Sequence, residues 1–202
     1  AVPLFIAARV LDAPPAALTQ AVAAMRHAPW LVGNLHLVAA LDDRPGAPPS
    51  WDNVLYDPGA ALPTLGYVDA MHQSTRSLPG PTVLTTYWAL GGNAPDELAR
   101  QRERLLNEPW SAWADAVVQG LAHVHPDLRA KLERADLMRY GHAMSIPVPG
   151  LRSSAALRAL ALPQRRVHFA HADLSTYSVF EEAMYHGARA AAQVRSGFTR
   201  SG

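Results

Sequence analysis

The stretch RVHFAHADLSTYSVFEEAMYHGARAAAQV, residues 166–194, carries the most specific pattern in the chain. Apolar residues alternate with polar or small ones over residues 167–170, and the alternation ends at Asp173. From residue 178 onward, apolar and small residues recur at helical spacing. The pattern predicts a strand, a turn with one carboxylate, and a helix whose first-turn N–H groups suit a carbonyl or an anion. The alternative is a terminal helix packed tightly on a sheet, which would account for the alanines.

The composition is that of a folded globular protein. Hydrophobic residues make up 49% of the 202 residues and charged residues 17%. Eighteen basic residues balance 17 acidic ones without a Lys/Arg block, which argues against a nucleic-acid partner. No apolar run approaches the roughly 18 residues of a membrane span, so we expect a soluble protein. The sequence does not distinguish a cytoplasmic from a periplasmic location. The absence of cysteine excludes disulfides and a cysteine nucleophile.

The hydrophobic periodicity predicts an α+β fold with a mixed or antiparallel sheet and helices packed on one face. Residues 1–11 read as a strand entered at once, without an initiator Met, as in a chain that begins in mid-domain. Further strands are predicted at 30–41, 53–56, 65–73 and 82–90, and an extended segment at 136–150. Helices are predicted at 14–25, 93–106, 108–124, 125–135 and 153–162. We expect one domain over residues 1–162 and an added strand and helix over residues 163–202.

Nine histidines invite a metal-binding interpretation, as in a metallohydrolase. The candidates are the pair His123 and His125 and the string His168, His171 and Asp173. Helical or strand geometry would turn the members of each set to different sides, so we expect no metal site. The sequence also lacks a Gly-x-Ser-x-Gly elbow, a Walker loop and a Gly-x-Gly-x-x-Gly fingerprint. These residues therefore encode no complete nucleotide site and no assignable catalytic residue.

A second candidate segment is RYGHAMSIPVPG, residues 139–150. In extended chain, Tyr140, His142 and Met144 share one face. An aromatic ring, a titratable ring and a thioether together predict the wall of a substrate pocket. The alternative is that Tyr140 and Met144 are ordinary core residues and His142 is a half-buried polar group.

FAHAD, residues 169–173, and EEAMYHG, residues 181–187, resemble two motifs near the C-termini of the flavin-containing amine oxidases, which include monoamine and polyamine oxidases. In that family a strand ends in F-A-G-E/D, and E-G-A-I-E-S-G then opens an Ala-rich helix. The resemblance implies that Asp173 contacts the ribityl and diphosphate part of FAD. It also implies that Glu181, Ala183 and Met184 lie at the pyrimidine edge of the flavin. His171 and Glu182 stand where the family has glycines.

The resemblance extends over most of the chain, with residues 1–162 similar to the family's substrate domain. It implies the C-terminal portion of an FAD-dependent oxidoreductase that transfers a hydride from a small molecule, such as an amine, to flavin. The family's N-terminal nucleotide-binding unit would be a missing portion or a partner chain, and the chain alone would bind FAD weakly or not at all. The alternative is a non-catalytic module that binds such a partner. Both hypotheses predict an exposed apolar face.

Overall fold

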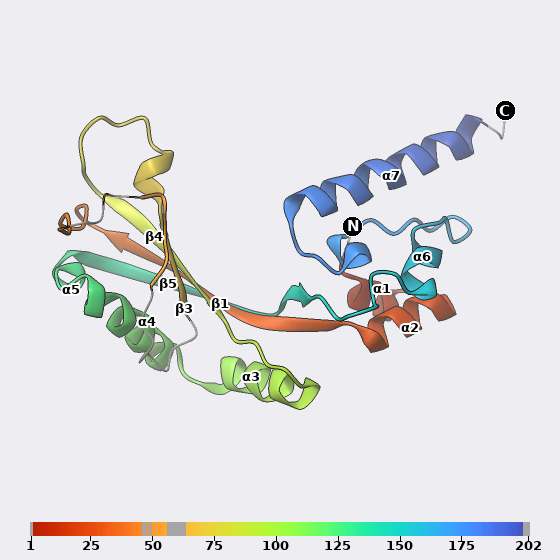
Figure 1. Cartoon of the computed structure of the whole chain (residues 1–202), viewed down its shortest axis with the longest axis horizontal. Helices are drawn as coiled ribbons and strands as arrows, with labels where there is room; N and C mark the ends of the chain where they lie inside the picture. The colour runs from red at the N-terminus through yellow and green to blue at the C-terminus, as the bar shows by residue number, and fades with distance from the viewer. Residues whose placement is uncertain (1, 46–47, 49, 56–63, 200–202) are drawn as a thin grey trace. The chain divides into compact units, whose positions relative to one another are not determined.

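The computed structural model describes residues 2–45, 48, 50–55 and 64–199 (Figure 1). The chain forms two units, one made of residues 1–27 and 144–202 and the other of residues 28–143. The boundary expected at residue 162 therefore lies within the first unit. The reason is that helices from both ends of the chain share one apolar core, which sequence adjacency does not reveal.

The first unit is helical. It contains α1 (Leu4–Val10), α2 (Ala16–Ala24), α6 (Ala155–Leu160), the 3₁₀ turn η2 (Ala172–Ser175) and α7 (Phe180–Thr199). The core of this unit is built from side chains of these elements and the segments beside them: Leu4, Ala7, Leu18, Ala21, Leu151, Leu157, Leu160, Phe169 and Leu174. α2 and α6 lie where the periodicity predicts helices.

The strand predicted over residues 1–11 is wrong, because this segment forms α1. Leu4 and Ala7 are buried and stand three residues apart, as one face of a helix requires. Pro3 immediately precedes the helix, and its carbonyl accepts from the N–H groups of Ile6 and Ala7. The apolar run thus contains a helical stripe that a β interpretation overlooks.

The strand predicted over residues 167–170 is also wrong. Its only ladder contact among the described residues is an isolated bridge between Gln164 and Val167. A strand needs a neighbour for its N–H and C=O groups, and here the Phe169 carbonyl accepts instead from the guanidinium of Arg189, at 2.7 Å. The C-terminal segment is therefore a turn followed by a helix, not a strand followed by a helix.

The second unit contains most of a five-stranded sheet in the order β2-β3-β4-β1-β5. The strands are β1 (Arg26–Leu37), β2 (Asp52–Asn53), β3 (Thr64–Asp69), β4 (Thr82–Ala89) and β5 (Leu132–Ile146). β1 pairs with β4, β4 with β3, and β3 with β2, in each case antiparallel. This confirms the predicted α+β class with an antiparallel sheet. Residue 56 of the predicted strand 53–56 lies outside the described residues.

Helices cover one face of this sheet (Figure 1). They are α3 (Pro95–Asn107), α4 (Trp110–Val124) and α5 (Leu128–Lys131), and the short 3₁₀ turn η1 (Ala70–Gln73) follows β3. Alternate residues of the strands, such as Leu31, Leu35 and Trp88, pack against Leu105, Trp113 and other residues of the helices. The rings of Trp88 and Trp113 meet edge to face with centroids 6.4 Å apart. The core of this unit thus lies between the sheet and its helices, and the other face of the sheet stays partly open.

The helix predicted over residues 125–135 is much shorter than expected. α5 ends at Lys131, and β5 begins at Leu132. The ammonium of Lys131 donates to the Ala40 carbonyl at 2.7 Å and to Asp127 at 2.8 Å. The backbone N–H of Val38 donates to the Lys131 carbonyl. Pairing with the end of β1 therefore overrides the helical propensity of residues 132–135.

A bulge at Gly66 shapes the edge of the sheet. The pairing of β3 with β4 shifts register between Thr64 and Tyr67. Gly66 has a φ of +114°, and a Cβ at this position would lie 1.9 Å from the Asn53 carbonyl oxygen. The hydroxyl of Thr86 donates to the Gly66 carbonyl at 2.9 Å. Only glycine suits this position, because both its φ and the close approach of β2 exclude a side chain.

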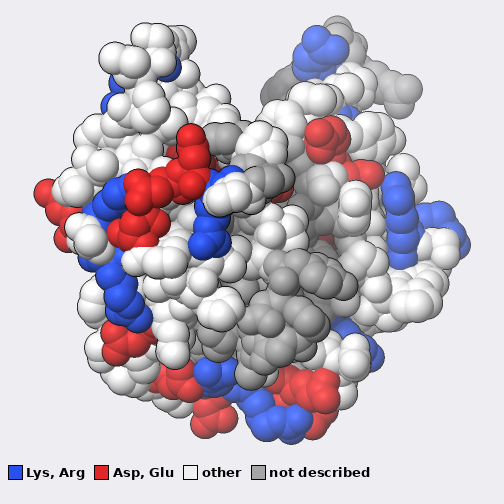
Figure 2. Space-filling model, turned by 60° about the vertical axis from the view of Figure 1, so that its left-hand side comes forward, with Lys and Arg blue, Asp and Glu red and all other residues white. Residues whose placement is uncertain are grey.

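On the face shown in Figure 2, Lys and Arg side chains are interspersed with Asp and Glu. That face carries no broad surface of one sign, in line with the near-zero formal charge. In the part of the chain that the structure describes, no helix is long and apolar enough to cross a membrane.

Candidate functional site

Asp173 is buried in the first unit and is only 1% exposed. One carboxylate oxygen accepts from the Leu4 N–H, the first of α1, at 2.9 Å. The other lies 3.1 Å from Nε2 of His27. Nδ1 of His171 lies 3.3 Å from the carboxylate and 3.1 Å from the Asp173 N–H. When neutral, this nitrogen can accept from the N–H, and when protonated it can donate to the carboxylate.

These contacts set the charge of Asp173. Burial opposes ionisation, but the hydrogen bonds from His171, His27 and the Leu4 N–H outweigh it and hold the pKa of Asp173 well below its usual range. The carboxylate is therefore ionised at neutral pH and already holds several donors. A direct contact with FAD would require one of these donors to move. In this structure Asp173 instead ties the start of α1 to the turn before α7.

The residue after this turn is strained. Thr176 follows η2 in the left-handed region, with φ 54° and ψ 26°, and is 2% exposed. A β-branched residue is uncommon in that conformation, which costs about 1–2 kcal/mol. Its N–H donates to the Asp173 carbonyl. The turn is therefore held by its surroundings rather than by local preference.

A second polar cluster joins the turn to α7. The hydroxyl of Ser175 donates to Glu182, and Nε2 of His186 lies 2.7 Å from the same hydroxyl. His186 is 6% exposed, and its Nδ1 has no hydrogen-bond partner among the described residues. Because the Ser175 hydroxyl donates its hydrogen bond to Glu182, Nε2 of His186 meets the hydroxyl oxygen as a donor and does not accept its proton. The cluster fixes the first two turns of α7 rather than forming a hydrolytic site.

The other side of the α7 start is exposed. Of the residues predicted to lie near flavin, Met184 is 59% exposed, and Glu181 and Ala183 are also exposed. The large apolar side chains beside them are Tyr177, Phe180 and Tyr185, with exposed fractions of 52%, 75% and 61%. We call Tyr177, Phe180, Met184 and Tyr185 the α7 apolar face. It is an exposed group of large side chains, of the kind that binds a ligand or partner.

The open face of the sheet in the second unit carries aromatic and polar side chains. Trp30 on β1 stacks on Tyr87 on β4, with centroids 6.2 Å apart and ring planes at 22°. The Tyr87 hydroxyl donates to Asp52 at 2.7 Å. Beside the stack, the Thr85 hydroxyl donates to Asn34 at 2.9 Å. Burial, this hydrogen bond and the charge of Asp52 raise the pKa of Tyr87 to about 12.

Tyr140 and His142 belong to this open face. Leu137 lies on the helical face, because its side chain would be 3.0 Å from a Cβ at Gly33, beside α4. Strand alternation places residues 138, 140 and 142 on the opposite face. The Tyr140 hydroxyl lies 3.5 Å from the Met138 sulfur, as the shared face requires. Met144, on the same strand, belongs to the first unit and is half-buried.

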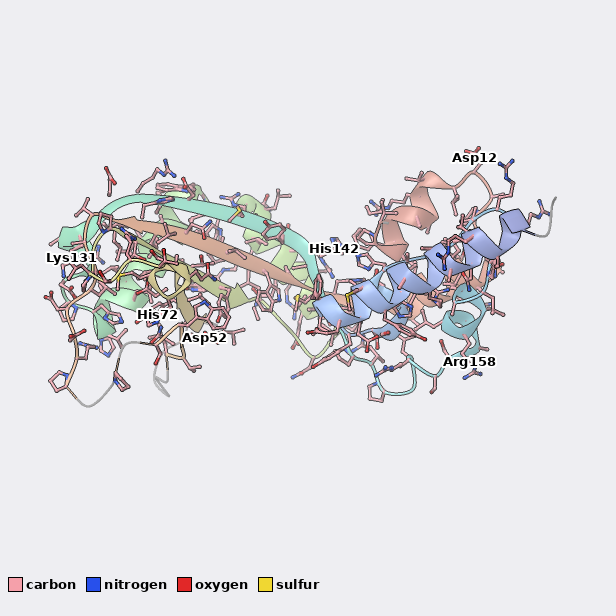
Figure 3. The ribbon with its side chains drawn as sticks, turned by 90° about the horizontal axis from the view of Figure 1, so that it is seen from above. Asp12, Asp52, His72, Lys131, His142 and Arg158 are labelled. Carbon is pink, nitrogen blue, oxygen red and sulfur yellow. The ribbon has the colours of Figure 1, made fainter. Side chains whose placement is uncertain are left out.

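Figure 3 labels Lys131, just before β5, and His142, near its end, and shows them far apart along the strand. The predicted wall residues thus lie toward the end of β5, whereas Lys131 is held in ion pairs with Asp42 and Asp127.

Sequence reasoning did not find Ser175, His186, Trp30 or Tyr87. Glu182 and His186 are four residues apart on a predicted helix, a spacing that could have suggested their contact. Trp30 and Tyr87 each lie in a predicted strand, but their stacking depends on the register of β1 against β4. In the described part of the chain, no group of three or more His, Asp or Glu side chains is placed to hold a metal ion.

Comparison with known proteins gives one kind of match. No protein-family model matches the chain, and no curated protein matches it. Among solved structures, cyclohexylamine oxidase from Brevibacterium oxydans matches with a TM-score of 0.61 over 93% of this chain, at 15% sequence identity. The match covers 39% of the oxidase chain. The two chains therefore share a fold over that portion of the oxidase.

Proposed function

We propose that this chain forms the substrate-facing and flavin-contacting portion of an FAD-dependent oxidoreductase that acts on a small molecule such as an amine. The observation that carries the proposal is the exposed start of α7, anchored by the buried turn at Asp173. It occurs in a chain whose fold resembles part of an amine oxidase. Bound FAD would supply the hydride acceptor, and the chain would orient and enclose its flavin ring.

The start of α7 suits one part of the cofactor better than another. Its first turn carries two carboxylates, Glu181 and Glu182, which disfavour a diphosphate at this helix end. Neutral carbonyl groups, such as those of the flavin pyrimidine edge, can accept hydrogen bonds from the helix N–H groups without that repulsion. The residues present therefore fit the flavin edge. We propose that Glu181, Ala183 and Met184 lie against it, and that Asp173 positions the turn beneath them.

The open face of the sheet supports a role in substrate binding. Tyr140 and His142 share that face with the stacked rings of Trp30 and Tyr87. Aromatic rings bind apolar groups by burying apolar surface area, and they bind cations through their π faces. We propose that this face contributes to the substrate wall. No residue of the chain is assigned to proton transfer.

The diphosphate and adenosine parts of FAD would be bound by protein that this chain does not supply. The chain spans 39% of the oxidase that it resembles, and it contains no Gly-x-Gly-x-x-Gly fingerprint. We propose that a nucleotide-binding portion, on the same polypeptide or on a partner chain, completes the site. The α7 apolar face is the surface that such a portion, or the flavin, would cover.

The test is the visible spectrum of the protein purified from its native host, recorded with its intact mass. Flavin absorbance, kept in the wild type and lost in Ala183→Arg, supports the proposal. Ala191→Arg is the matched control, because it changes another exposed alanine two helical turns along α7 and should keep the flavin. A protein whose intact mass includes a nucleotide-binding portion, but which is colourless and takes up no added FAD, overturns the proposal.

The second candidate function is a partner-binding module without catalysis. It is favoured by the same α7 apolar face, since 75% exposure of Phe180 is unusual for a residue of this size. The two candidates differ in one result. If Phe180→Asp abolishes association with a partner chain while neither protein nor complex shows flavin absorbance, the module is the better description.

A further inference from the structure

The second unit contains a pocket of about 400 Å³ that the proposed flavin role does not use. Its lining comes from the segment after β1, from β3 and η1, and from the end of α4. The lining residues used below are Leu41, Arg44, Leu55, Tyr67, Asp69, Met71, Val124 and His125. We call it the Tyr67–His125 pocket. All of its described lining lies within residues 28–143.

Two polar side chains of this lining, Tyr67 and His125, are buried. Tyr67 is 7% exposed and His125 is 8% exposed. The Tyr67 hydroxyl lies 2.7 Å from Nε2 of His125, and the two rings meet edge to face. Nδ1 of His125 is buried and has no hydrogen-bond partner in the described part of the chain. A buried polar atom without a partner costs about 1–3 kcal/mol, so a ligand group that reaches Nδ1 gains up to that amount.

Both groups are neutral at pH 7. Burial, reinforced by the positive charge of Arg44, lowers the pKa of His125. Burial and the negative charge of Asp69 raise the pKa of Tyr67. The carboxylate of Asp69 already accepts from the Met71 N–H and the Thr82 hydroxyl, at 2.9 and 2.6 Å. A charged ligand would therefore lose its hydration at this point without meeting a free buried counter-charge.

The partly buried apolar lining suits an apolar molecule, whereas the charged lining residues Asp42, Asp43 and Arg44 are exposed. Leu41, Leu55, Met71 and Val124 present aliphatic or thioether surface around the polar pair. Small-molecule sites usually combine such walls with a few polar groups that fix orientation. The imidazole can present Nδ1 as a donor or as an acceptor, depending on which way its bond to Tyr67 runs. A hydroxyl group fits either arrangement, whereas a carbonyl fits only one.

We propose that the Tyr67–His125 pocket binds a small, mainly apolar molecule that carries a hydroxyl group, which forms a hydrogen bond with Nδ1 of His125. The site is separate from the flavin contacts proposed above and does not depend on them. Loss of flavin binding would leave it unchanged, and failure of this proposal would not affect the assignment of α7.

The test uses four probes of one ring size: benzyl alcohol, toluene, benzoate and benzylamine. Binding is followed in the whole chain by the ¹³C shift of the Met71 methyl group, assigned with Met71→Leu. The Met138 methyl group, on the open face of the sheet, is the internal control. Benzyl alcohol should shift the Met71 resonance saturably, with a Kd about tenfold lower than that of toluene. Benzoate and benzylamine should bind more weakly than benzyl alcohol.

Two variants test whether probe binding depends on His125 and on the space in the pocket. His125→Gln should raise the Kd of benzyl alcohol about fivefold and leave that of toluene within about twofold. Leu41→Phe fills the pocket, keeps both polar side chains, and should weaken both probes. If His125→Gln unfolds, the probe series in the wild type and in Leu41→Phe still decides. The proposal is overturned if no probe shifts Met71, if toluene binds as well as benzyl alcohol, or if a charged probe binds most tightly.

Discussion

The carboxylate of Asp173 accepts a hydrogen bond from the N–H of Leu4 across 169 residues of sequence. The same carboxylate meets His27, which is 146 residues away from it in the chain. One buried side chain thus holds the start of α1 and the beginning of β1 to the turn that precedes α7. The position of the α7 start therefore depends on contacts made by the opposite end of the chain.

Asp173→Asn should lower the free energy of unfolding by about 2–4 kcal/mol, because an amide group turns a donor toward either the Leu4 N–H or His27. Urea unfolding at pH 7 measures the loss. Asp12→Asn, an exposed change in the same unit, should stay within about 0.5 kcal/mol of the wild type. Equal stability of the wild type and Asp173→Asn would show that this carboxylate does not hold the unit together.

Acid should remove the same stabilisation. The pKa of Asp173 is lower in the folded state than its ordinary value of about 4. Its contribution is therefore present above pH 4 and is lost as the pH falls toward the folded-state pKa. The wild type should lose more stability than Asp173→Asn between pH 5 and pH 2. Parallel curves for the two proteins would contradict this assignment.

Gly66→Ala should be strongly destabilising, by more than about 2 kcal/mol. The new Cβ would meet the Asn53 carbonyl oxygen at 1.9 Å, in a backbone conformation with φ +114°. Gly141→Ala is the matched control, because a Cβ there meets nothing within 4 Å. That change should be neutral or slightly stabilising. Thermal unfolding of the two variants distinguishes a required glycine from a tolerated one.

Much of the fold could be predicted from local periodicity. Residues 14–25, 82–90 and 108–124 each show one clear period, and each forms the predicted element. The two strands that were predicted wrongly share another cause. In both segments, contacts with residues far away in the sequence determine the secondary structure. Within the segment predicted as a strand over residues 1–11, Leu4–Val10 forms a helix that packs against the far end of the chain. The segment at 167–170 has only one bridge in place of a ladder.

The candidate site shows the same division. Its most specific residue, Asp173, stood out because a carboxylate ends an apolar run. Its partners Leu4 and His27 could not be predicted, because no local pattern links segments so far apart. The stack of Trp30 on Tyr87 likewise needs the register of β1 against β4, which pairs Val32 with Tyr87. Residue types were visible in the sequence, but the contacts that give them a role required the fold.

Two residues with positive φ should respond differently to glycine. Arg165 has φ 57° and is exposed, so Arg165→Gly should stabilise the protein by about 1 kcal/mol. Thr176 has φ 54° but is buried, so Thr176→Gly relieves the backbone and loses packing. Its gain should be smaller than that of Arg165→Gly. Chemical unfolding ranks the two, and the reverse order would show that packing at Thr176 contributes little.

His186 should make the protein sensitive to mild acid. Burial and the positive charge of Arg189 lower its pKa in the folded state, although Glu182 acts in the opposite direction. The unfolded chain therefore binds a proton more readily, and stability is lost as the pH falls below about 6.5. Between pH 7 and pH 5, His186→Gln should lose less stability than the wild type. His72→Gln, an exposed control, should follow the wild-type curve.

Tyr87 provides a test on the open face of the sheet. Its pKa of about 12 reflects burial first, and then its hydrogen bond to Asp52 and the charge of that residue. Because the folded-state pKa exceeds the ordinary value of about 10, the contribution to stability is present below pH 10 and is lost as the pH rises through the folded-state pKa. Asp52→Asn removes the charge, so the Tyr87 pKa should fall toward 10.

The measurement is the ultraviolet difference titration of phenolate, with Tyr87→Phe used to identify the contribution of this one residue among six tyrosines. Tyr140→Phe is the control on the same face, and it should leave the late-titrating group in place. If Asp52→Asn leaves the Tyr87 pKa near 12, burial in the stack with Trp30 is sufficient to raise it. In that case the hydrogen bond to Asp52 does not determine the pKa of Tyr87.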